Sequence, residues 1–107
     1  MTEEEAVAIK TEFSRKYMRK DPWSDYVNTC ALSDLATAEW MTADTQTQLS
    51  PGALEAIRVR LEKKGYKADD WCITVGLRKL LPNNLRLPSA YKGLRVYICW
   101  LGEVVVH

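Results

Sequence analysis

Apolar residues near the N-terminus recur at helical spacing. They lie three or four positions apart and therefore share one face of a helix: Ala6, Ile9, Phe13 and Tyr17. Thr2 stands before this stripe and Glu5 stands three positions after Thr2, which is the spacing of a capping box. The pattern predicts a helix over the first twenty residues, with one apolar face and one polar face.

The next segment fits two structures. Asp21-Pro22 is typical of a helix start, and apolar residues from Trp23 to Ala38 keep roughly helical spacing. The stretch from Tyr26 to Leu32 equally fits a short strand before a turn at Ser33-Asp34. We favour the helix, and the strand remains the alternative.

Residues 42–64 predict a loop followed by a helix. Thr42 to Ser50 is polar and has the composition of a connecting loop. Ser50-Pro51 then resembles a serine cap followed by proline at the first helical position, and an apolar face follows: Leu54, Ile57 and Leu61. Because Gly65 is suited to ending a helix, we expect this one to span about residues 51–64.

The last third of the chain changes to the two-residue period of strands. Apolar residues alternate from Trp71 to Leu77, as in a half-buried strand, and again from Leu94 to Leu101. Residues 80–93 between them are rich in Pro, Asn and Gly, which predicts an ordered surface loop. Gly102 suits a tight turn or a bulge, after which Val104–Val106 would form a further strand.

These elements predict the α+β class. Helices come first and strands last, so we expect two or three helices packed on one face of a small antiparallel sheet of two to four strands. The 107 residues would form a single domain, 1–107, because one core of this size needs about 100–200 residues.

Composition narrows the class of protein. The chain is 47% hydrophobic and 27% charged, as in globular proteins, and no apolar run is long enough for a membrane helix. The acidic N-terminus is unlike a secretory signal, so we expect a cytoplasmic protein without a membrane partner.

The charges are distributed unevenly, although the net charge is only +1. Residues 21–50 contain no Lys or Arg but hold five acidic residues: Asp21, Asp25, Asp34, Glu39 and Asp44. Basic residues gather at the end of the first predicted helix, from Arg15 to Lys20, where the helix dipole favours them. A contact between these basic residues and nucleic acid is the alternative interpretation.

The chemistry-bearing residues do not form a catalytic motif. Cys30, Cys72 and Cys99 are not spaced as zinc ligands, and the sole histidine is His107 at the chain end. Asp69-Asp70 could join other carboxylates around a divalent cation, but no second motif supports this. We therefore assign no catalytic residue, metal or cofactor, and we interpret the cysteines as buried apolar side chains.

The aromatic residues suggest binding. Four tryptophans and five tyrosines offer large rings with a polar edge, which anchor many interfaces. We expect a non-enzymatic module that binds another protein through an aromatic and basic surface, with candidate residues Trp40, Tyr91, Lys92, Arg95 and Tyr97. The preferred site is the side of the predicted strand that carries Arg95 and Tyr97, provided that no helix covers it.

Two further hypotheses stay open. A nucleic-acid-binding domain would use Arg78, Lys79, Arg86, Lys92 and Arg95 against phosphates. A homodimer could form if the C-terminal strand, Val104–Val106, paired with a second copy.

Overall fold

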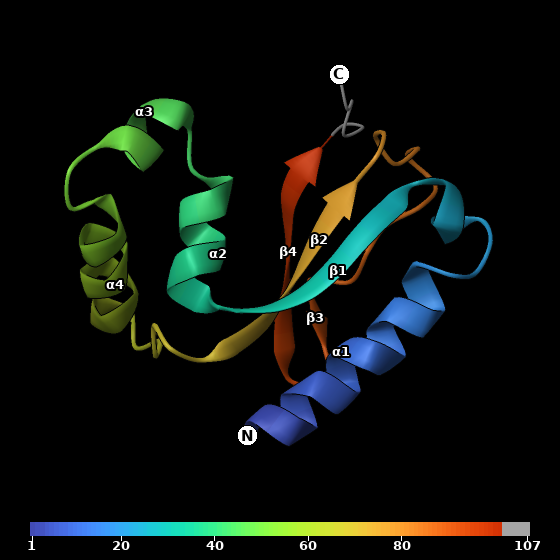
Figure 1. The fold of residues 1–107 in the computed structure, drawn as a ribbon, viewed down its shortest axis with the longest axis horizontal. Coiled ribbons are helices and arrows are strands. Elements are labelled where there is room, and N and C mark those ends of the chain that lie inside the picture. The colour runs from blue at the N-terminus through green and yellow to red at the C-terminus, as the bar shows by residue number, and fades with distance from the viewer. Residues whose placement is uncertain (102–107) are drawn as a thin grey trace.

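The computed structural model describes residues 1–101 of the chain and contains helices on both sides of one sheet (Figure 1). In chain order the elements are α1 (Glu3–Tyr17), a short 3₁₀ helix (Trp23–Asp25), β1 (Val27–Asp34), α2 (Leu35–Thr42), α3 (Thr45–Leu49), α4 (Ala53–Lys63), β2 (Trp71–Leu77), β3 (Ala90–Tyr91) and β4 (Leu94–Leu101). The α+β class predicted from the sequence is confirmed.

The sheet is mixed, whereas the sequence led us to expect an antiparallel one. Its strand order is β1-β2-β4-β3; β2 is antiparallel to β1 but parallel to β4, and β3 is antiparallel to β4. Parallel neighbours need a long return connection. Residues 78–93 supply it, because they lead from the end of β2 back to the start of β4.

Helices cover both faces of this sheet and not one face only. On one face Ile73, Val75 and Leu77 of β2 belong to a buried cluster with Phe13 and Tyr17 of α1. On the other face Cys72 belongs to a second buried cluster, which α2 and α4 supply with Leu35, Ala36, Ala38, Ile57 and Leu61. The expectation of a half-buried strand at Trp71–Leu77 is therefore wrong, since β2 is buried on both sides.

The first helix follows its local signals closely. The Thr2 side chain accepts a hydrogen bond from the Glu5 backbone N–H at 3.2 Å, as the capping box predicts. Ala6, Phe13 and Tyr17 are buried along the predicted stripe. Local propensity and tertiary packing agree here, so α1 forms where it was expected.

The helix that we favoured between residues 21 and 41 is wrong in its first half. Val27–Asp34 forms β1, which pairs with β2, and helical structure is limited to the short 3₁₀ helix Trp23–Asp25 before it and to α2, Leu35–Thr42, after it. Within β1, Cys30 and Leu32 are partly buried against the first cluster, while Thr29 and Ala31 are exposed. Pairing with β2 decides between two periods that the short apolar stretch fits equally.

The expected loop at residues 42–50 contains a short helix. Asp44 caps α3 by accepting a hydrogen bond from the Thr47 backbone N–H at 2.8 Å. The next helix, α4, was expected and begins two residues later than predicted, because its N-cap is Gly52 in the left-handed conformation at φ +73°. Gly65 follows its end at φ +87°, as expected for a helix stop.

The C-terminal part agrees with the sequence as far as the structure describes it. Residues 80–93 are mostly loop, with β3 at Ala90–Tyr91, and β4 spans the predicted strand. The turn at Gly102 and the strand Val104–Val106, with the dimer contact proposed for it, lie outside the described residues. Among residues 1–101, the structure contains no helix with the length and apolarity needed to cross a bilayer.

Candidate functional site

The five binding residues proposed from the sequence lie in three separate places. Tyr91 and Lys92 contact α1, Arg95 and Tyr97 lie on the sheet face that carries α2, and Trp40 stands on α2 itself. The structure does not gather them into one surface. Each place is therefore considered separately below.

Tyr91 and Lys92 hold the β3–β4 turn against α1. The Tyr91 hydroxyl donates to Glu12 Oε1 at 3.0 Å, and Lys92 Nζ lies 2.7 Å from both carboxylate oxygens of Glu12. The hydrogen bond from Lys92, and to a smaller extent that from Tyr91, lowers the pKa of Glu12. The hydrogen bond to the Glu12 carboxylate in turn raises the pKa of Lys92. The Tyr91 ring also packs edge-on against Phe13 at 5.3 Å. This pair is accounted for by contacts inside the fold.

Arg95 and Tyr97 belong to a series of side-chain contacts that connects the sheet to the helices. The Arg95 guanidinium lies 5.1 Å from the ring centre of Tyr66 and 5.2 Å from that of Tyr97. The Tyr97 hydroxyl donates to Glu39 of α2 at 3.2 Å, and Glu39 also accepts from Arg60 of α4 at 3.2 Å. Burial raises the pKa of Tyr97 to about 12.

The binding site predicted at Arg95 and Tyr97 required a strand face that no helix covers, but α2 lies against this face of β4. Tyr97 and Cys99 pack on the second buried cluster, and Cys99 Sγ lies 3.9 Å from the Ala38 carbonyl oxygen. This face of β4 is thus an interface between the sheet and α2. Only Arg95 retains an exposed side chain there among the residues considered.

The basic residues of the nucleic-acid hypothesis are also dispersed. Arg78 and Lys79 follow the end of β2, whereas Arg95 pairs in register with Cys72 near its start. These residues therefore lie at opposite ends of the sheet. Lys92 is paired with Glu12, and Lys79 lies 5.0 Å from the ring centre of Tyr26. The fold therefore does not bring Arg78 and Lys79 together with Arg95 on one surface for nucleic acid.

The thiols are held protonated by burial. It raises the pKa of Cys72 to about 12 and that of Cys99 to about 11, and it also raises the pKa of Cys30. A protonated thiol is a poor nucleophile and a poor metal ligand. Asp69 accepts a hydrogen bond from Arg58 at 2.9 Å, and residues 1–101 contain no cluster of three metal-ligating side chains.

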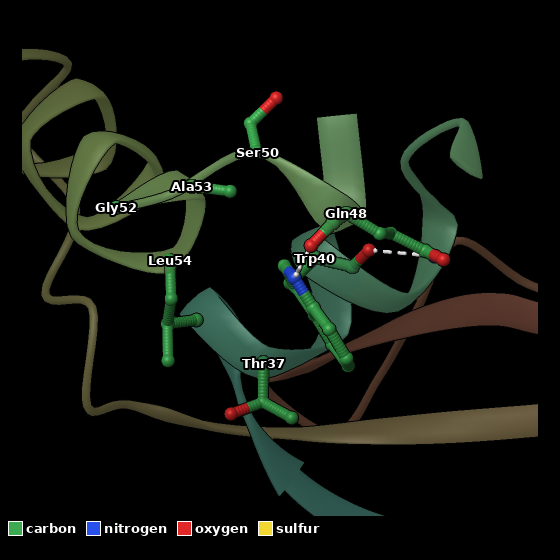
Figure 2. A pocket seen from close by; sticks show the side chains of 7 residues that line it. All are labelled: Thr37, Trp40, Gln48, Ser50, Gly52, Ala53 and Leu54. Atoms are coloured by element: carbon green, nitrogen blue, oxygen red, sulfur yellow. Dashed lines mark hydrogen bonds between the residues drawn. The ribbon is translucent and has the colours of Figure 1, made fainter. Parts of the chain in front are cut away.

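A groove between α2, α3 and the start of α4 is the candidate site, and Trp40 forms one of its walls (Figure 2). The Trp40 indole N–H donates to the Gln48 backbone carbonyl at 3.3 Å. The Gln48 side-chain amide in turn donates to the carbonyls of Trp40 at 3.0 Å and Met41 at 3.1 Å. These reciprocal hydrogen bonds fix α3 on α2 and hold the indole ring in place.

The opposite wall comes from the first turn of α4. Figure 2 shows Ala53 and Leu54 on one side of the groove and Trp40 on the other. Thr37 and Ser50 also line it, and their hydroxyls donate to the Asp34 carboxylate at 2.6 Å and to the Gln46 carbonyl at 2.9 Å. The groove has a volume of about 370 Å³, and Leu54 remains 38% exposed at its rim. The arrangement can receive an apolar side chain from another molecule.

The sequence pointed to Trp40 but missed the rest of this groove. Leu54 was placed in the apolar core stripe of its helix, although its side chain reaches the surface. Gln48 was placed in a loop. The Asp44–Thr47 spacing was an available cap signal for α3, which is the helix that presents Gln48 to Trp40.

Comparisons with protein-family models, with curated proteins and with solved structures found no match for this chain.

Proposed function

We propose that this domain is a protein-binding module whose partner inserts a large apolar side chain between Trp40 and Leu54. The observation that carries the proposal is the pre-formed groove, in which hydrogen bonds already fix the tryptophan ring. A wall that is rigid before binding loses little conformational entropy in the complex. Tryptophan is also enriched among residues that dominate binding energy.

The chemistry of the lining supports binding in preference to catalysis. The groove is lined by apolar groups, hydroxyls and one amide, from Thr37 and Trp40 to Leu54. None of these side chains titrates near neutral pH. A partner's apolar residue would be desolvated there, which yields about 25 cal/mol for each Å² of apolar surface removed from water.

Acidic residues on the helices that form the groove favour a basic partner segment. Asp44 caps α3 and Glu55 lies in the first turn of α4, and both are exposed. The nearby cations Arg58 and Arg60 are already paired with Asp69 and Glu39. We therefore propose a peptide segment in which a large apolar residue is flanked by Lys or Arg.

A random peptide library displayed on phage tests this proposal. Selection on the wild-type domain should enrich peptides with an aromatic or leucine anchor beside Lys or Arg. These peptides should bind the Leu54→Asp variant at least about tenfold more weakly, because the aspartate removes apolar contact surface at the rim and puts a hydrated carboxylate beside the buried anchor. Binding is measured by fluorescence anisotropy.

The matched control is Val59→Asp. Val59 lies on the same helix and is 41% exposed, close to the 38% of Leu54, but it does not line the groove. This variant should bind the peptides like the wild type, and circular dichroism should show both variants folded. Equal binding by both aspartate variants, or selection of peptides without an apolar anchor, would refute the proposal.

A further inference from the structure

A second hollow lies on the opposite face of the sheet, along the flank of α1 that borders β1. Its volume is about 320 Å³, and its lining includes three basic side chains, those of Lys10, Arg15 and Arg19. Cys30 of β1 also lines it, which places the hollow beside an edge strand of the sheet. Figure 1 shows α1 passing along β1 on the side away from α4.

No carboxylate lines this hollow beside its three cations. None of them forms an ion pair with a carboxylate in the part of the chain that the structure describes. Glu12 stands three residues before Arg15 on α1, but its carboxylate is engaged by Lys92 and Tyr91 and does not line the hollow. Arg15 lies in the last turn of α1 and Arg19 lies beyond its end, and both line the hollow, so their like charges repel each other.

The other groups of the hollow leave this positive charge unopposed. Burial keeps the Cys30 thiol protonated by raising its pKa, although Ser14 and Lys10 act in the opposite direction. Thr11 and Ser14 contribute hydroxyl groups, of which that of Thr11 donates to the Val7 carbonyl at 2.9 Å. The helix dipole favours Arg15 near the end of α1 but explains neither Lys10 in mid-helix nor the gathering of three cations around one hollow.

We propose that this hollow binds a phosphate group, either as inorganic phosphate or as the ester of a small organic molecule. Two guanidinium groups and one ammonium group would surround the anion, and guanidinium forks match the geometry of phosphate oxygens. A bound dianion would also remove the repulsion between the three cations. This site is independent of the Trp40 groove, which lies on the other face of the sheet.

Titration followed by ¹H–¹⁵N NMR tests the proposal. Sodium phosphate and glycerol 3-phosphate are added separately at an ionic strength held constant with sodium chloride. The amide signals of the hollow, including Thr11, Ser14 and Cys30, should shift saturably. The double variant Arg15→Gln/Arg19→Gln should weaken binding at least about tenfold, because it removes two charge-assisted contacts.

A second double variant separates a built site from general attraction. Lys16→Gln/Lys20→Gln removes the same charge from the same end of α1, but neither residue lines the hollow. It should change the affinity by less than about twofold, since exposed charges at a distance are largely screened. Equal loss in both variants, or shifts that do not saturate, would overturn the proposal.

The two added anions also identify the source of the phosphate group. Tighter binding of glycerol 3-phosphate indicates an organic ester, and equal or tighter binding of sodium phosphate indicates the free ion. A single-stranded oligonucleotide forms a third arm. If it alone binds, with shifts spread beyond the hollow, the site is a polyanion surface and the small-ligand proposal is wrong.

Discussion

Replacing Phe13 by alanine tests whether the two buried clusters form one cooperative unit. The Phe13 side chain is fully buried, and its ring centre lies 4.7 Å from that of Tyr17 and 5.3 Å from that of Tyr91. Removing such a ring costs about 3–5 kcal/mol, a large part of the roughly 5–15 kcal/mol that stabilises a typical domain.

The loss should reach the far face of the sheet through β2. Ile73 and Val75 of β2 pack in the cluster of Phe13, while Cys72 of the same strand packs in the other cluster. Loss of packing in either cluster therefore exposes β2, whose other face contributes to the second cluster. We expect one unfolding transition for both faces, as in most small domains.

Urea denaturation with two probes measures this coupling. Circular dichroism reports global unfolding, and pulse labelling reports the Cys72 thiol in a background with Cys30→Ala and Cys99→Ala. With a slope of about 2 kcal/mol per M, the loss lowers both midpoints by about 2 M. Val7→Ala on the exposed side of α1 should change the midpoint little, because Val7 is 42% exposed.

One result would refute the reasoning. If Phe13→Ala lowered the midpoint by circular dichroism but left that of Cys72 labelling unchanged, the two faces would unfold separately. Should Phe13→Ala fail to fold, Phe13→Leu creates a smaller cavity and should move both probes in the same direction by a smaller amount.

Two further predictions follow from local contacts. Burial raises the pKa of Cys72 from 9.0 to about 12, so the folded state holds this proton more tightly than the unfolded state. The resulting stability is complete below pH 9 and declines toward pH 12, by at most about 1.4 kcal/mol per pH unit for one proton. Urea midpoints should therefore fall more steeply with pH in the wild type than in Cys72→Ala. Asp34 caps α2 by accepting from the Thr37 backbone N–H at 3.1 Å, so Asp34→Ala should cost about 1 kcal/mol and speed hydrogen exchange at Thr37. Asp34→Asn, which keeps an acceptor oxygen, should retain most of that stability, and an equal loss in both variants would contradict a capping role.

The candidate groove was predictable only in part. A tryptophan in an acidic segment suggested a binding role for Trp40, and that role remains a proposal. The partners of Trp40 in the groove could not be read from the pattern, because Gln48 and Leu54 belong to two other helices. The prediction of an open surface at Arg95 and Tyr97 was wrong for a related reason. The packing of α2 on β4 is a contact between segments distant in the sequence, so the local pattern could not reveal it.

The sequence by itself determined the elements whose signals are local. Thr2 and Glu5 begin α1, Gly65 ends α4, and the two-residue period of Leu94, Val96 and Ile98 predicts β4, because each signal acts between residues a few positions apart. Only the tertiary structure decided that Val27–Asp34 is a strand, that β2 and β4 are parallel, and that β2 is buried on both faces. These features depend on backbone pairing and apolar burial between residues separated by tens of positions, and such contacts stabilise a segment only once the whole chain is folded.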